Sequence, residues 1–101
     1  MKALTKIEVT EFLSVNLPGW SYNEGSIKRE FKFKTFVEAF SFMTAVAMVA
    51  EKSDHHPDWN NVYNRVSIHL YTHDANGITK SDFDLAGKID KIFSNYPQAV
   101  P

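Results

Sequence analysis

The chain of 101 residues contains no cysteine. This absence excludes a disulfide scaffold, thiolate catalysis and any zinc or iron–sulfur site built on cysteine. The most apolar stretch, residues 45–50, is far shorter than the roughly 20 residues that a membrane helix needs. The N-terminal residues also lack the apolar core of a signal peptide. We therefore expect a soluble, cytoplasmic protein that makes no contact with a membrane.

The charge balance of the chain argues against a polyanionic partner. A formal net charge of −1 leaves no excess of lysine and arginine, which a nucleic-acid binder normally shows, so we expect no direct nucleic-acid binding. The hydrophobic share of 44%, with 14% aromatic residues, is enough for a globular fold. A chain of this length predicts one domain over residues 1–101 with one modest core.

The first third of the chain predicts a helix followed by a hairpin. Thr5 and Glu8 have capping-box spacing at the start of the helix, and a Pro-Gly pair ends it. Residues 20–22 and 27–33 flank a turn, as the two arms of a hairpin do, and the second arm alternates between apolar and polar side chains. Arg29 falls on the apolar side of that arm, where we expect it to extend toward solvent at the sheet edge.

The middle of the chain predicts the longest helix and the main part of the core. Thr35 and Glu38 form a second capping-box pattern, and apolar residues then recur at helical spacing to about Lys52. We expect a buried stripe of Phe36, Phe40, Met43, Ala47 and Ala50, widened by Val37, Thr44 and Met48.

The last third predicts a strand, a turn and a helix. Residues 62–72 alternate between apolar and polar side chains as a strand does, and residues 58–60 are compatible with a further short strand. A turn over residues 74–77 leads to Thr79, which caps a helix with Asp82 in its first turn. The buried face of this helix is expected to contain Leu85, Ala86, Ile89 and Phe93. The element order predicts an α+β fold in which the helices cover one face of an antiparallel sheet.

All four histidines lie between residues 51 and 74. Imidazoles both donate and accept protons near neutral pH, so His55, His56 and His73 are candidates for acid–base catalysis. His69 and His73 share a strand face, but at about 3.3 Å per residue they are roughly 13 Å apart, too far to share a metal ion. No His-Glu-x-x-His pattern is present either. We therefore expect no metal, and we expect His69 to be a sheet-face residue.

Several motifs together resemble the pterin-4a-carbinolamine dehydratase family. The central one is Glu51-Lys52-x-Asp54-His55-His56-Pro57-Asp58-Trp59, followed by Asn61-Val62-Tyr63, Thr72-His73-Asp74 and Gly77-Ile78-Thr79. Upstream, Leu17-Pro18-Gly19-Trp20 and Phe31-x-Phe33 extend the resemblance over nearly the whole chain. Asn76 departs from the pattern, since the family commonly has a second glycine there, but asparagine tolerates the same left-handed backbone.

This resemblance implies four antiparallel strands, three helices on one face, and a homo-oligomer that is a dimer or a dimer of dimers. It implies a hydro-lyase that dehydrates 4a-hydroxytetrahydrobiopterin to the quinonoid dihydropterin and so recycles tetrahydrobiopterin for aromatic amino-acid hydroxylation. No metal or organic cofactor is expected. The family's catalytic histidines match His55, His56 and His73. The positions expected to bind the substrate are Glu51, Asp54, Pro57, Trp59, Thr72, Asp74 and Ala75.

Within this scheme we assign proton transfer to His56 and His73 and orientation of the substrate hydroxyl to His55. Glu51 is expected to hold the guanidine-like edge of the pterin; a solvated carboxylate at a helix end is the alternative. Two other functions remain open. One is a non-catalytic dimerisation module that acts as a transcriptional cofactor, and the other is a histidine protein that binds zinc or copper.

Overall fold

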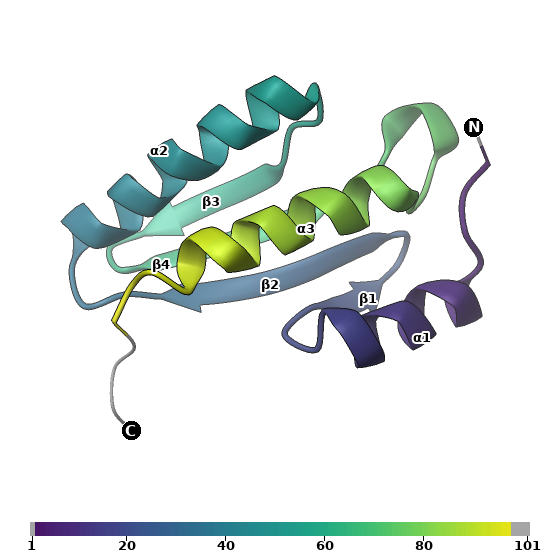
Figure 1. The fold of residues 1–101 in the computed structure, drawn as a ribbon, viewed down its shortest axis with the longest axis horizontal. Coiled ribbons are helices and arrows are strands. Elements are labelled where there is room, and N and C mark those ends of the chain that lie inside the picture. The colour runs from purple at the N-terminus through teal and green to yellow at the C-terminus, as the bar shows by residue number, and fades with distance from the viewer. Residues whose placement is uncertain (1, 98–101) are drawn as a thin grey trace.

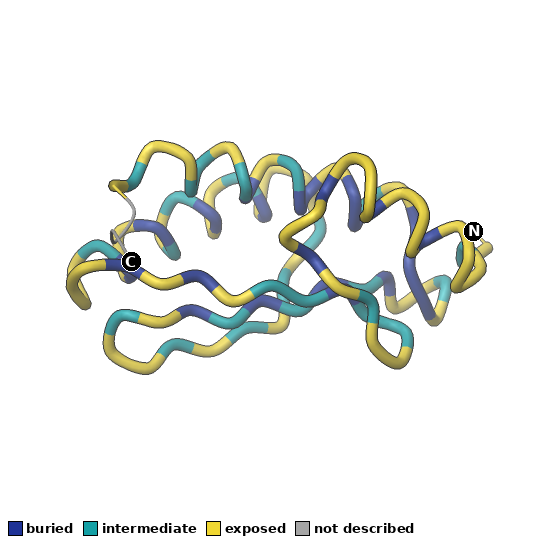
Figure 2. The backbone as a smooth tube through the Cα atoms, turned by 90° about the horizontal axis from the view of Figure 1, so that it is seen from below, coloured by how far each residue is buried: buried dark blue, intermediate teal, exposed yellow. Residues whose placement is uncertain are grey.

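The computed structural model describes residues 2–97. Within them, four antiparallel strands form one sheet in the order β1-β2-β4-β3, and three α-helices lie on one side of it (Figures 1 and 2). The elements are α1 (Lys6–Asn16), β1 (Ser21–Asn23), β2 (Ser26–Lys32), α2 (Phe36–Ser53), β3 (Asp58–Val62), β4 (Arg65–Leu70), the 3-10 turn η1 (His73–Ala75) and α3 (Lys80–Phe93). The predicted α+β class is confirmed. Among the described residues, no helix is long and apolar enough to cross a membrane.

The first two helices begin where the sequence predicts. Thr5 forms the full capping box, because its hydroxyl accepts from the Glu8 N–H while its own N–H donates to Glu8 Oε1. That backbone hydrogen bond lowers the pKa of Glu8, since it favours the charged carboxylate. The second box forms only in part. Thr35 accepts from the Glu38 N–H, but the Glu38 carboxylate accepts from the N–H of Lys34 instead of that of Thr35.

The strand predicted over residues 62–72 is divided between two elements. β3 extends to Val62, Tyr63 turns the chain at φ 51°, and β4 begins at Arg65. The Asn61 side chain stabilises this turn by donating to the carbonyls of Tyr63 and Arg65. The prediction was wrong here because alternation of apolar and polar residues continues across the turn, and Tyr-Asn is not a common two-residue hairpin loop.

Arg29 does not lie at a sheet edge, so that prediction was wrong. β2 is a central strand, and Arg29 pairs with Ile68 of β4. On the helix side its guanidinium lies 4.7 Å from the ring centre of Phe31 and donates to Asp90 Oδ1 of α3 at 2.8 Å. The same oxygen accepts from the indole N–H of Trp20 at 2.9 Å. Asp90 therefore joins the hairpin to α3, through partners that lie 61 and 70 residues away in the chain.

The buried stripe of α2 also differs from the prediction. The residues that face the sheet are Ala39, Phe42, Val46 and Ala50, of which only Ala50 belonged to the expected stripe. Met43 is partly buried against the core. Four members of the expected stripe instead expose between 49% and 75% of their surface: Phe36, Val37, Phe40 and Met48. We call these four the outer apolar face of α2. The helix is apolar on two sides, and periodicity alone does not select the one that packs on the sheet.

We predict that Asp90→Ala lowers the free energy of unfolding by about 2 kcal/mol, because it leaves the half-buried Arg29 and the Trp20 indole without their acceptor. Chemical denaturation measures this change. Asp84→Ala on the same helix is the control, because the Lys80–Asp84 pair is exposed and its loss costs less than about 0.5 kcal/mol. Equal effects of the two substitutions would contradict the structural role of Asp90.

Candidate active site

One wall of the site is the segment that follows α2. The helix ends at Asp54, whose backbone is left-handed (φ 51°) and whose N–H donates back to the last turn. The His55 N–H donates to the carbonyl of Ala50, which closes the helix end. Pro57 cannot continue a helix, so the chain leaves in an extended direction and enters β3. The histidine pair therefore sits at a tightly fixed reversal of the chain.

The facing wall is the segment that follows β4. Thr72 and Gly77 pair as an isolated antiparallel bridge, and η1 lies between them. Asn76 closes the turn at φ 54°, which confirms the expected turn with an asparagine in a left-handed conformation. A side chain at Gly77 would come within 2.7 Å of the Ala3 Cβ, so glycine is needed there for space.

A cavity of about 300 Å³ lies between these two segments. We call it the histidine pocket; its lining residues are Asp54, His55, His56, Tyr71, Thr72, His73 and Asp74. The three histidines that were proposed as catalytic thus line one cavity, together with three of the expected substrate-binding residues. His69 does not line it.

Each of these three imidazoles has one ring nitrogen hydrogen-bonded to another side chain, which is a carboxylate for two rings and a hydroxyl for the third. His55 Nε2 lies 2.6 Å from Asp82 Oδ1, and His56 Nε2 lies 2.8 Å from Glu51 Oε1. In contrast, His73 uses Nδ1, which lies 2.8 Å from the hydroxyl of Tyr71. Among residues 2–97, no hydrogen bond engages the second nitrogen of any of the three rings. Three imidazoles around one cavity, each held at one nitrogen, are suited to donating and accepting protons.

Asp82 is fully buried and joins three segments. Its Oδ2 accepts from the Thr72 hydroxyl at 2.8 Å and from the Thr79 N–H at 2.9 Å, while Oδ1 is bonded to His55. The capping-box spacing of Thr79 and Asp82 predicts the bond within the helix. It gives no sign of the contact with His55, which lies 27 residues earlier. Sequence reasoning therefore found Asp82 as a cap and missed it as a histidine partner.

The four other expected substrate-binding residues lie outside the lining of the histidine pocket. Glu51 lies in the last turn of α2 and is bonded to His56, with both side chains exposed. Pro57 precedes β3, and Trp59 within β3 packs against the core opposite Ile68. Ala75 ends η1.

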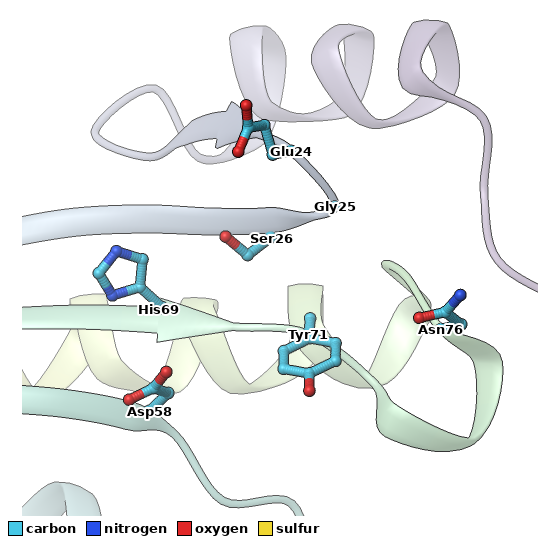
Figure 3. A pocket seen from close by; sticks show the side chains of 7 residues that line it. All are labelled: Glu24, Gly25, Ser26, Asp58, His69, Tyr71 and Asn76. Carbon is cyan, nitrogen blue, oxygen red and sulfur yellow. The ribbon is translucent and has the colours of Figure 1, made fainter.

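A second, larger cavity of about 500 Å³ lies on the sheet face that the helices do not cover (Figure 3). We call it the open-face pocket; its lining residues are Glu24, Gly25, Ser26, Asp58, His69, Tyr71 and Asn76. His69 pairs with Asp58 across β4 and β3. Tyr71 lines both pockets. Its only signal in the sequence is its place on the polar side of a strand, which does not distinguish it from its neighbours.

Among residues 2–97, no three His, Asp or Glu side chains are placed so that they could hold one metal ion. The carboxylates nearest the histidines act instead as hydrogen-bond partners of the rings, as Asp82 and Glu51 show.

Comparison with known proteins gives a consistent picture. The family model described as "Pterin 4 alpha carbinolamine dehydratase" matches residues 2–92. A Prochlorococcus marinus (strain NATL2A) protein with the curated name "Putative pterin-4-alpha-carbinolamine dehydratase" is 49% identical over 91% of this chain and 96% of its own length. A protein of the same name from Synechococcus sp. (strain WH7803) is 50% identical over 91% of this chain and 99% of its own length.

Two solved structures have the same fold. The transcriptional coactivator/pterin dehydratase from Brucella melitensis matches with a TM-score of 0.86 and 46% identity over 90% of this chain and 98% of its own. A pterin dehydratase-like protein, identified as a RuBisCO assembly factor in the alpha-carboxysome, matches with a TM-score of 0.62 over 73% of this chain and 86% of its own. It is only 19% identical and so shows the fold alone. Because the family model and these relatives span nearly the full length, the chain belongs to the pterin 4 alpha carbinolamine dehydratase family.

Proposed function

We propose that this protein is a hydro-lyase that converts 4a-hydroxytetrahydrobiopterin to quinonoid dihydrobiopterin and so recycles tetrahydrobiopterin for aromatic amino-acid hydroxylation. The observation that supports the chemistry most directly is the convergence of His55, His56 and His73 on one cavity, each with one nitrogen bonded. Family membership supports the choice of a pterin as the substrate.

The reaction needs an acid and a base at neighbouring atoms. The C4a–O bond breaks as an acid protonates the departing oxygen, and a base removes the proton from N5, whose electron pair forms the new double bond to C4a. We assign these two transfers to His56 and His73, whose rings are exposed. His55 orients the hydroxyl, because it is the ring held most firmly, by the buried carboxylate of Asp82 at 2.6 Å.

The pterin itself offers amide and amino N–H donors, which carboxylates bind well. Asp54 and Asp74 line the histidine pocket, which supports assigning them as acceptors for these donors, and Thr72 lines the same pocket. Glu51 binds the pterin edge only if it exchanges or shares its bond to His56. For Pro57, Trp59 and Ala75 the assignment to the substrate site rests on the family resemblance.

A second candidate function is a protein-binding module. The Brucella melitensis relative carries the description of a transcriptional coactivator as well as a dehydratase. In this chain, the outer apolar face of α2 gives such a function a physical basis, because four large apolar side chains on one helix are exposed. We propose that a second copy of the chain covers this face, in a dimer or a dimer of dimers.

The dehydratase proposal predicts rapid breakdown of 4a-hydroxytetrahydrobiopterin by chelator-treated protein. His56→Ala and His73→Ala should each lower kcat by about 10² to 10⁴-fold, because each removes an acid–base group. Stopped-flow absorbance of the pterin measures the rate. His69→Ala is the matched control, since this histidine lies outside the histidine pocket. Near-normal turnover in both active-site variants would disprove the assignment, and a wild-type rate no faster than buffer would disprove the dehydratase itself.

The role of Asp82 predicts a separate effect. Asp82→Asn should lower the free energy of unfolding by about 2 kcal/mol. The substitution replaces one acceptor oxygen with an NH2 donor, which must face either the Thr72 and Thr79 donors or the His55 ring. We also expect kcat to fall about tenfold at a temperature where the variant is folded, since His55 loses its charged partner. Asp84→Asn, exposed on the same helix, should change neither quantity. Normal turnover of folded Asp82→Asn would limit Asp82 to a structural role.

The oligomer proposal predicts a mass above the 11.5 kDa of one chain in light scattering coupled to size-exclusion chromatography. Phe40→Asp places a charge in the middle of the outer apolar face and should shift the protein toward the monomer. Val15→Asp is the control, because it changes an exposed valine on α1 instead. A monomeric wild-type protein, or an unchanged mass in Phe40→Asp, would show that this face does not join copies of the chain.

A further inference from the structure

Tyr71 follows β4 directly and is packed against a catalytic candidate. Its hydroxyl oxygen lies 2.8 Å from His73 Nδ1, and the two ring centres are 4.3 Å apart at an interplanar angle of 49°. The side chain is half-buried and lines the open-face pocket (Figure 3). It also lines the histidine pocket. Two contacts, one polar and one between rings, therefore fix the orientation of the His73 imidazole.

The three histidines differ in the nitrogen that they leave for a substrate. His55 and His56 are bonded through Nε2 to carboxylates, which only accept, so the neutral rings carry their proton on Nε2 and keep Nδ1 for other partners. His73 is bonded through Nδ1 to a hydroxyl, which leaves Nε2. Of the three rings in the pocket, His73 is thus the one that offers Nε2.

We propose that Tyr71 is a positioning residue for His73: its hydroxyl oxygen accepts from the Nδ1–H, so that Nε2 is the nitrogen that gains and loses the catalytic proton. The kinetic part of this proposal rests on the proposed dehydratase function; the tautomer does not. In a neutral imidazole only one nitrogen carries the proton, and the hydrogen bonds of the ring determine which nitrogen that is. The phenol oxygen accepts the hydrogen bond from Nδ1–H, and its own O–H group can still donate to another acceptor.

This arrangement serves both protonation states of His73 without a change of partner. As imidazolium, the ring gives its Nε2 proton to the departing oxygen while the C4a–O bond breaks and its electron pair stays on that oxygen, which leaves as water. A second histidine takes the N5 proton, so protons and electrons balance. The neutral His73 that results still donates Nδ1–H to Tyr71, and Nε2 is ready to be protonated again. No ring rotation or partner exchange is needed between turnovers.

Tyr71→Phe removes only the hydroxyl and keeps the ring contact. We expect kcat for 4a-hydroxytetrahydrobiopterin to fall at least about tenfold with KM changed less than about twofold, because the lost interaction acts on proton transfer and not on binding. Tyr63→Phe makes the same chemical change in the turn between β3 and β4 and should leave both constants unchanged. A rise in KM at constant kcat would show that Tyr71 binds the substrate instead and would overturn the proposal.

The tautomer is read directly from the ¹⁵N chemical shifts of the His73 ring, assigned by comparison with His73→Gln. Well above the pH at which the ring is protonated, the wild-type protein should show a protonated Nδ1 and an unprotonated Nε2. In Tyr71→Phe the populations should shift toward protonated Nε2. Wild-type His73 protonated on Nε2, or an unchanged tautomer in the variant, would overturn the proposal. These spectra give their result even if the wild-type protein fails to dehydrate the pterin, so the two proposals fail independently.

Discussion

The structure around the histidine pocket depends on one buried carboxylate. Asp82 caps α3 through Thr79, accepts from Thr72 at the end of β4, and holds His55 at the end of α2. A carboxylate removed from water is tolerated only when its oxygens are well bonded, so all three segments must meet for the fold to be stable. The same requirement that stabilises the core therefore assembles both walls of the pocket. The contacts that stabilise the fold therefore also set the geometry of the site.

Much of the site was predictable because its signals are local. The cap at Thr79, the turn at Asn76 and the histidine pair after the long helix follow from residues within a few positions of one another. The family resemblance then grouped His73 with the other two rings. Contacts between distant segments were missed, since neither composition nor periodicity shows that Asp82 meets His55. Tyr71 was missed for a different reason, because a tyrosine two residues before a histidine on a strand face is an ordinary pattern.

Two of the wrong predictions, those for α2 and for Arg29, share a physical origin. In α2 the hydrophobic pattern is satisfied by two faces, and the one that packs is chosen by the sheet beneath it, with Phe42 and Val46 buried and Phe40 exposed. For Arg29 the alternation correctly gave the side of the strand. Its environment depended on Asp90, an acceptor from a helix much later in the chain. In both cases local sequence determined the element, and tertiary packing determined what the side chain met.

The two chain reversals beside the pocket have a consequence for its engineering. Asp54 and Asn76 both adopt left-handed backbone conformations, which branched side chains accept only with strain of about 1 to 2 kcal/mol. Backbone geometry at these two positions therefore acts together with the hydrogen bonds of Asp82 to hold the two walls in place. A library that reshapes this pocket for a different heterocycle should keep Asp54 and Asn76, or replace them only with glycine, and vary the side chains of the facing walls.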